Sequence, residues 1–352
     1  MNKNPVRQFN FRRPGIVASA VVMIAVVFAF SSCPAHTPAA GIFVYNESDP
    51  FMHEFAEQIV RQAKGRFATT LYYANNSQLI QNEQIEAERA KKSDILLVNP
   101  VDRLGAFAII RKMKAENVPV IFFNREPLAA DLALWDRTFY VGARPEQSGQ
   151  LQAHMVIDLF GGNPDAPNEY DRNGDGVIQA ILFKGEQGHQ DAETRTTEVL
   201  RSFEKAGWKV ELLGMEIANW NRDEAYSKAG SLLAAWKPAL ELVLSNNDDM
   251  ALGVISRMRQ EGWFKDSNGN GRIDQKDASW IPVVGIDGIA DARESIAEGY
   301  LYGTVTNNSL QMAASIVELT EMLLGERSEQ ELSVPLTDGK YIWVDYQPYI
   351  SR

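Results

Sequence analysis

The chain has 352 residues, a length that favours two domains over one. It carries 35 Lys and Arg against 46 Asp and Glu, and its net charge of −11 argues against nucleic acid or an anionic membrane surface as the main partner. One Cys and four His, with no His-x-x-x-His pair, exclude a disulfide framework and leave little for transition-metal catalysis.

The first 33 residues have the features of an export signal. Residues 1–13 contain four basic residues and no acid, and an apolar run from Ile16 to Phe30 follows, too short to span a bilayer securely. Small residues before Cys33 resemble a bacterial lipobox, although Phe30 stands where leucine is more common. We therefore expect a lipid anchor on Cys33 and a tether over residues 34–40. An uncleaved anchor helix is the alternative.

Either arrangement places the folded part outside the cytoplasm, in the periplasm, attached to a bacterial membrane only through its anchor. Loss of the four basic residues would change the net charge from −11 to −15.

The rest of the chain alternates β-rich runs with stretches of helical periodicity. The expected strands are Ile42–Tyr45, Thr70–Tyr73, Ile95–Asn99, Val118–Asn124, Ala180–Lys184, Glu241–Asn246 and Ile281–Ile286. The helical stretches between them include Phe51–Gly65, Leu104–Glu116, Ala192–Lys205 and Met250–Gln260. This alternation predicts an α/β fold with two doubly wound parallel sheets. Ligands of such sheets bind beyond the carboxyl ends of the strands.

Polar and aromatic residues follow the expected strands. They are Asp49, Phe51, Asn124, Glu126, His189, Asp191, Arg195, Trp220, Asn247, Asp287 and Asn307. No Ser or Cys nucleophile with a plausible base stands out, and no Gly-x-Gly-x-x-Gly follows a strand. A sugar suits this set, because its hydroxyls both donate and accept hydrogen bonds and its C–H faces pack on aromatic rings.

Four stretches resemble the galactose/glucose-binding members of the bacterial periplasmic binding protein family, namely residues 118–127, 184–197, 246–251 and 281–287. The resemblance runs in order from about Gly41 to near Val344. It implies two lobes that close on one hexose, with three hinge crossings near Ala143, Asn307 and Trp343. The lobes would comprise residues 41–143 with 308–343, and residues 144–307 with 344–352.

The resemblance also implies roles for individual residues. The hydroxyl-binding set would be Asp49, Asn124, His189, Asp191, Arg195, Asn247, Asp287 and Asn307, and Phe51 and Trp220 would be the two rings that sandwich the sugar. Taken singly, each residue has an ordinary structural reading, such as an N-cap for Asp or Asn, core packing for Trp, or a local loop hydrogen bond for His189. Ten residues in register with one family favour the sugar site.

Residues 171–179 match the first nine positions of an EF-hand calcium loop. Its expected ligands are Asp171, Asn173, Asp175, Val177 through its carbonyl, and Gln179. Position 12 is Leu182 and brings no carboxylate. The family resemblance supplies one, because Glu241 matches the family's distant calcium glutamate. A turn without metal is the alternative.

Residues 266–277 form a second match, at a place where the family has only a short turn. Its expected ligands are Asp266, Asn268, Asn270, Arg272, Asp274 and Asp277. Asp277 stands at position 12 and is one methylene shorter than the usual Glu, which can weaken bidentate binding. We expect Ca²⁺ here as well, against the alternative of a bare surface turn.

These features predict a monomeric, lipid-anchored receptor that binds D-glucose or D-galactose and delivers it to an ABC permease. A chemosensory protein that acts through a chemoreceptor is the alternative, and the sequence does not separate the two. A sugar-responsive repressor is excluded, because the export signal stands where its DNA-binding domain would be. We expect no enzyme: Asp191 and Asp287 could form a glycosidase pair, but carboxylates that bind sugar hydroxyls look the same in sequence.

Overall fold

The structure is a computed structural model that describes residues 1, 3 and 36–350. The expected export signal and Cys33 lie outside the described residues, so both stay predictions. The chain divides into two units, Met1–His36 and Thr37–Arg352, and the second contains both sheets. Within the described part, no helix is long and apolar enough to cross a membrane.

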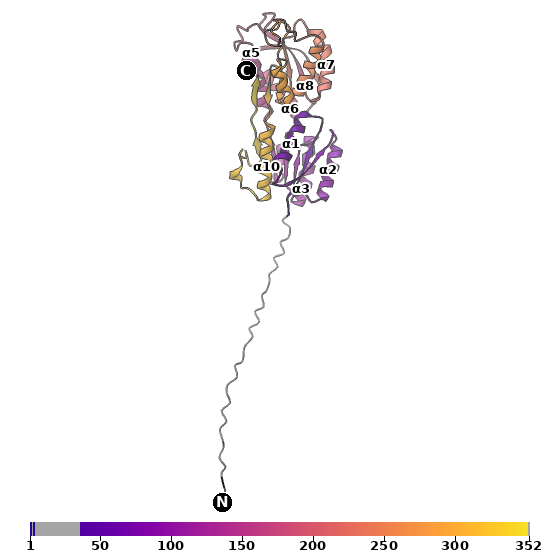
Figure 1. Cartoon of the computed structure of the whole chain (residues 1–352), viewed down its shortest axis with the longest axis vertical. Helices are drawn as coiled ribbons and strands as arrows, with labels where there is room; N and C mark the ends of the chain where they lie inside the picture. Colours follow the sequence, from indigo (N-terminus) through magenta and orange to yellow (C-terminus); the bar gives the residue numbers. More distant parts are fainter. Residues whose placement is uncertain (2, 4–35, 351–352) are drawn as a thin grey trace. The chain divides into compact units, whose positions relative to one another are not determined.

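The first sheet has six strands in the order β11-β5-β4-β3-β1-β2, and all of its pairs are parallel. Its strands are β1 (Ala39–Val44), β2 (Ala68–Tyr73), β3 (Ile95–Val98), β4 (Val120–Phe123), β5 (Thr138–Gly142) and β11 (Tyr341–Trp343). The helices of this lobe are α1 (Pro50–Ala63), α2 (Gln78–Ala90), α3 (Ala106–Glu116), α4 (Ala129–Leu132) and α10 (Ser309–Leu324), with short 3₁₀ turns at Arg103–Gly105 and Glu329–Glu331. Figure 1 shows α1, α2, α3 and α10 gathered around this sheet.

The second sheet also has six strands, in the order β12-β10-β9-β8-β6-β7. Its strands are β6 (Val177–Lys184), β7 (Lys209–Ile217), β8 (Leu242–Ser245), β9 (Val283–Asp287), β10 (Gly303–Thr306) and β12 (Gln347–Ile350). Its helices are α5 (Pro145–Leu159), α6 (Gln190–Lys205), α7 (Arg222–Trp236), α8 (Asp248–Gln260) and α9 (Ala290–Ala297). The edge strand β12 is antiparallel to β10, whereas the other pairs are parallel.

The predicted α/β class with two parallel sheets is confirmed, and β12 is its one antiparallel exception among the described strands. The central strands are almost wholly buried, as expected of parallel strands covered by helices on both faces. The chain passes between the sheets after β5, after β10 and between β11 and β12. The lobe boundaries given above, and the action of these crossings as hinges, stay predictions.

Several helices begin on side chains that the sequence pointed to as ligand-binding. Asp49 caps α1 by accepting a hydrogen bond from Met52 N, and Asn247 caps α8 by accepting one from Met250 N. His189 caps α6 by accepting from Asp191 N. Each cap holds a polar side chain at the carboxyl end of the preceding strand. These three residues are therefore N-caps, which is their ordinary structural role. The cap hydrogen bonds also fix the direction in which each side chain points.

Helices α5 and α6 pack closely because a glycine faces the contact. A Cβ built at Gly149 would lie 2.9 Å from the carbonyl oxygen of Arg195 and 3.0 Å from the backbone nitrogen of Val199. Backbone atoms cannot yield as a flexible side chain can, so only glycine fits at this crossing.

We expect Gly149→Ala to lower the free energy of unfolding by about 1–3 kcal/mol, because the added methyl group forces α5 away from α6. Gly105→Ala is the matched control: Gly105 has an ordinary φ of −72°, and its nearest neighbour is the Gln78 side chain at 3.5 Å. Urea unfolding measures both variants. Equal stabilities for the two would contradict this account of the α5–α6 contact.

Candidate ligand-binding site

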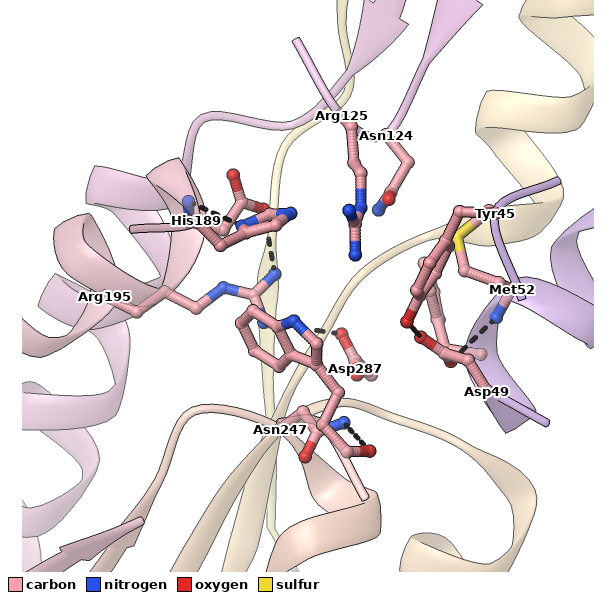
Figure 2. Close-up of a pocket in the computed structure, with 12 residues that line it drawn as sticks. Tyr45, Asp49, Met52, Asn124, Arg125, His189, Arg195, Asn247 and Asp287 are labelled. Carbon is pink, nitrogen blue, oxygen red and sulfur yellow. Dashed lines mark hydrogen bonds and ion pairs between the residues drawn. The ribbon is translucent and has the colours of Figure 1, made fainter. Parts of the chain in front are cut away.

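A pocket lies between the carboxyl ends of the two sheets. Its lining residues are Tyr45, Asp49, Phe51, Met52, Asn124, Arg125, His189, Asp191, Arg195, Trp220, Asn247 and Asp287 (Figure 2). The structure thus brings together every residue that the sequence assigned to sugar binding except Asn307. Asn307 lines a neighbouring cavity, and Phe51 and Asp287 line both cavities.

Asp49 and Tyr45 form one wall of the pocket in the first lobe. Tyr45 Oη donates a 2.6 Å hydrogen bond to Asp49 Oδ2, and Met52 N donates a 3.1 Å hydrogen bond to Asp49 Oδ1. Burial raises the pKa of Asp49, although these hydrogen bonds act in the opposite direction. The Arg125 guanidinium lies 3.8 Å from the centre of the Tyr45 ring and provides a cation near this carboxylate.

Asn124 follows β4 in the left-handed conformation, with φ of 59°. Asn99 Nδ2 donates to Asn124 Oδ1 at 3.2 Å, and Tyr140 Oη donates to the Asn124 carbonyl at 2.9 Å. Asn99 and Tyr140 are themselves buried. Two buried partners therefore fix both the backbone and the amide of Asn124 at the pocket.

Asp191, His189 and Trp220 form the opposite wall in the second lobe. The His189 ring lies 5.2 Å from the Trp220 ring in an edge-on arrangement. Burial and the nearby guanidinium groups of Arg125 and Arg195 hold the pKa of His189 well below its ordinary value, so the ring is neutral. Its Nδ1 accepts the hydrogen bond of the α6 cap, which leaves Nε2 as the protonated nitrogen and a donor.

Arg195 is the centre of the site. Its Nη1 donates to the Asn246 carbonyl at 2.7 Å and lies 3.8 Å from Asp287 Oδ1. Its Nη2 donates to Tyr346 Oη at 3.0 Å and to Asp191 Oδ2 at 3.4 Å. Burial alone would lower the pKa of Arg195, but Tyr346, Asp287 and Asp191 raise it above the ordinary value. The guanidinium is therefore a permanent, fully enclosed positive charge.

Asp287 ends β9 with φ of 122°, a conformation that side-chain-bearing residues rarely adopt. Burial raises its pKa well above the ordinary value, and the attraction of Arg195 works against that rise. Asn247 Nδ2 lies 3.4 Å from the Trp220 carbonyl, which ties the Asn247 side chain to the Trp220 segment.

Two polar atoms at the site are buried without a hydrogen-bond partner among the described residues: Arg195 Nε and Asn307 Oδ1. Both residues are at least 95% buried, Arg195 with 3% and Asn307 with 4% of its surface exposed. An unpaired buried polar group is unfavourable by about 1–3 kcal/mol. The unpaired donor belongs to the pocket and the unpaired acceptor to the cavity beside it, and a polar ligand that reaches both would complete their hydrogen bonding.

Direct bonds join the two lobes beside the pocket. Arg125 Nη2 of the first lobe donates to Glu186 Oε2 of the second at 3.0 Å, and Gln190 Nε2 donates to Glu126 Oε2 at 3.0 Å. The lobes therefore touch around the ligand-binding residues in this structure.

The 171–179 loop has the shape of a cation-binding loop. Asp171 accepts hydrogen bonds from Gly174 N and Gly176 N, and both glycines have positive φ. Glu241 is buried, and it accepts from Arg172 N at 2.6 Å and from Gln179 N at 3.2 Å. The carboxylate expected from a distant part of the chain thus lies against the loop.

The 266–277 loop repeats these contacts position by position. Asp266 accepts from Gly269 N and Gly271 N, which also have positive φ. Asp277 is buried and accepts from Ser267 N at 2.7 Å and from Asp274 N at 3.0 Å. These are the second and ninth loop positions, the same two that Glu241 contacts in the first loop.

Neither loop places three acidic, His or Cys side chains close enough to hold a metal by themselves, and no such group occurs elsewhere in residues 36–350. An EF-hand-type loop completes its oxygen shell with amide and carbonyl oxygens, and both loops contain these groups. In the structure the amide nitrogens of Asn173 and Gln179 lie 2.9 and 3.0 Å from Asp175 Oδ2. A half-turn of each amide would present its oxygen instead. The donor sets fit a hard cation.

Sequence analysis did not identify Tyr45, Met52, Arg125 and Tyr346 as site residues. Tyr45 and Arg125 adjoin strand ends and could have been found by reading every residue there. Met52 is apolar, which gives no signal in a sequence. Tyr346 lies in the last crossing between the sheets, about 150 residues after its partner Arg195, and nothing local to it indicates that contact.

Comparison with known proteins places the chain among periplasmic receptors. A family model described as a periplasmic binding protein domain matches residues 40–328. The chain is 31% identical over 323 residues to the D-galactose/methyl-galactoside binding periplasmic protein MglB of Haemophilus influenzae, covering 91% of each chain. It is 22% identical to the ribose import binding protein RbsB of Escherichia coli, covering 93% of this chain and 98% of that relative.

Solved structures share the fold. A solute-binding protein of Actinobacillus succinogenes with bound D-allose matches with a TM-score of 0.72 at 18% identity, covering 89% of this chain and 98% of that chain. One from Bacillus halodurans with bound myo-inositol matches with a TM-score of 0.69 at 22% identity, covering 91% and 96%. These relatives are named as binding proteins, which supports the expectation that this chain is not an enzyme.

We expect Tyr346→Phe to lower the free energy of unfolding by about 2 kcal/mol, because the buried Arg195 loses a hydrogen-bond acceptor. Tyr349→Phe is the control, since Tyr349 is exposed in β12, and we expect a change of less than about 0.5 kcal/mol. Denaturant unfolding in the absence of ligand measures both. An undiminished stability of Tyr346→Phe would contradict the role given to this contact.

Proposed function

Because this chain belongs to the periplasmic binding protein family, we propose that it is the sugar-binding receptor of an ABC transporter and that its ligand is one hexose, D-glucose or D-galactose. The receptor would act in the periplasm and deliver the sugar to the permease subunits as a monomer. We include in the proposal a lipid anchor on Cys33, which lies outside the described residues.

The observation that carries this proposal is the composition of the pocket. Carboxylates, amides and two guanidinium groups from both lobes surround it, and Phe51 and Trp220 also line it. Each sugar hydroxyl can donate to a carboxylate and accept from a nitrogen, and the ring faces suit aromatic side chains. The unpaired Arg195 Nε would donate to one sugar oxygen, and the unpaired Asn307 Oδ1 would accept from another.

The choice of binding over chemistry rests on the relatives of this chain and not on the pocket carboxylates. Asp191 and Asp287 both face the Arg195 guanidinium, at 3.4 and 3.8 Å. Burial raises the pKa of both carboxyl groups, as it does for a general acid, whereas the relatives of this chain are named as binding proteins. Glycosidase activity is accordingly not part of the proposal. A chemosensory role is the alternative to transport. Closure of the two lobes around the sugar would serve recognition by a chemoreceptor as well as recognition by the permease.

The sugar proposal predicts that D-glucose or D-galactose changes the Trp220 fluorescence and releases heat in a calorimetric titration. Asp287→Ala should weaken the affinity about a hundredfold, because Arg195 and a sugar hydroxyl lose a charged partner. Asp223→Ala removes an exposed acid in the first turn of α7 and should leave the affinity unchanged. Absence of binding by the wild-type protein, or full affinity of Asp287→Ala, would refute the proposal.

We further propose that both loops bind Ca²⁺, with Glu241 completing the 171–179 site and Asp277 the 266–277 site. Burial raises the pKa of Glu241, and the negative charge of Asp171 adds to this rise, so a cation would relieve the repulsion between the two carboxylates. When bound, Ca²⁺ would supply positive charge and a rigid oxygen shell at the base of β6. The role would be structural, at a distance from the sugar pocket residues.

Calorimetric titration of the chelator-treated protein with CaCl₂ should show two equivalents. Glu241→Ala should remove one equivalent and Asp277→Ala the other, so that each variant serves as the control for its counterpart. One equivalent in the wild type, unaffected by Asp277→Ala, would refute the second site. No binding at all would refute both.

A further inference from the structure

Asp248 is a buried carboxylate that the binding pocket does not use. It is the first residue of α8, directly after Asn247, and none of its surface is exposed. Its Oδ2 accepts hydrogen bonds from Gly288 N at 2.6 Å and from Ile289 N at 3.1 Å. Its Oδ1 accepts from Thr304 Oγ1 of β10 at 2.7 Å. The carboxylate thus joins α8 to the end of β9 and to β10.

The two backbone donors follow Asp287 directly in the chain. Asp287 has φ of 122° and Gly288 has φ of 74°, so the backbone turns sharply as β9 ends. A non-glycine residue in such a conformation is strained by about 1–3 kcal/mol and persists only where neighbouring contacts hold it. The two hydrogen bonds to Asp248 are contacts of this kind.

The Asp248 carboxylate packs directly against the backbone of β9 at Gly285. A Cβ at Gly285 would lie far inside van der Waals contact with Asp248 Oδ1. Thr304 Oγ1 also accepts a 3.2 Å hydrogen bond from Gly288 N. Asp248 and Thr304 therefore both accept a hydrogen bond from Gly288 N.

Holding a charge at this place is costly. Burial raises the pKa of Asp248 to about 7, even though Thr304, Gly288 and Ile289 donate to the carboxylate. A neutral side chain of similar size would avoid this cost but could not accept from all three donors. The buried Asp248 carboxylate thus lowers the stability of the fold but holds the turn after β9 in one position.

We propose that Asp248 is a positioning residue for ligand binding, which holds the turn after β9 so that the Asp287 carboxylate faces Arg195 and the ligand. The inference rests on the proposed function, because Asp287 is assigned there to the sugar. Asp248 acts through the backbone of residues 288 and 289 and does not touch the sugar itself.

The first test compares two threonine variants by calorimetric titration with D-glucose and D-galactose. Thr304→Val removes the hydroxyl that donates to Asp248 and should weaken the affinity about threefold to tenfold. Thr320→Val is the matched control: Thr320 is equally buried, but its hydroxyl donates to the Ile316 carbonyl within α10. We expect its affinity to stay within about twofold of the wild type. Asp248→Asn should weaken the affinity about tenfold or more.

The second test separates positioning from a general loss of structure. In an Asp287→Asn background, Asp248→Asn and Thr304→Val should each change the affinity by less than about twofold, because the group they position is already altered. An equal fold-change in both backgrounds would overturn the inference, and so would wild-type affinity of both single variants. Should Asp248→Asn fail to fold, Thr304→Val decides the outcome. A wild-type protein that binds neither sugar would overturn the proposed function and this inference with it.

Discussion

The buried guanidinium of Arg195 is the constraint on which the rest of the site depends. An unpaired charge in the protein interior is very unfavourable, so a buried arginine requires partners on nearly every side. Asp191, Asp287, Tyr346 and the Asn246 carbonyl provide them. These partners come from α6, β9, the last crossing between the sheets and the segment after β8. Neutralising one cation therefore brings four separate parts of the chain to one point.

The same arrangement explains why the pocket suits a neutral, hydroxyl-rich ligand. Arg195 lies beside Asp191 and Asp287, and Arg125 lies near Asp49, so each positive charge in the pocket has an acidic neighbour. Helix caps and strand ends hold the surrounding polar groups, which limits the entropy that they lose when a ligand binds. Asn307 Oδ1 and Arg195 Nε are left with unmet hydrogen-bonding capacity. A ligand that both donates and accepts would meet it.

The two sheets and most of the pocket residues could be predicted from the sequence, because buried parallel strands are recognisable from their own residues. Buried runs such as Ile95–Val98 and Val120–Phe123 are continuous and apolar, and the residues after them must lie at the edge where ligands bind. Contacts between distant segments had no such signature. Tyr346, and the hydrogen bonds of Asp248 to Gly288 and Ile289, depend on tertiary packing. The Glu241 contact with the 171–179 loop was expected only through resemblance to a family.

A crystal structure of the complex with D-glucose or D-galactose tests the central claim most directly. The account predicts one sugar ring in the pocket between Phe51 and Trp220. Asn307 Oδ1 should accept a hydrogen bond from one hydroxyl of that sugar, and Arg195 Nε should donate to one of its oxygens. A sugar bound elsewhere, or a ligand that leaves both of these atoms unpaired, would contradict the account.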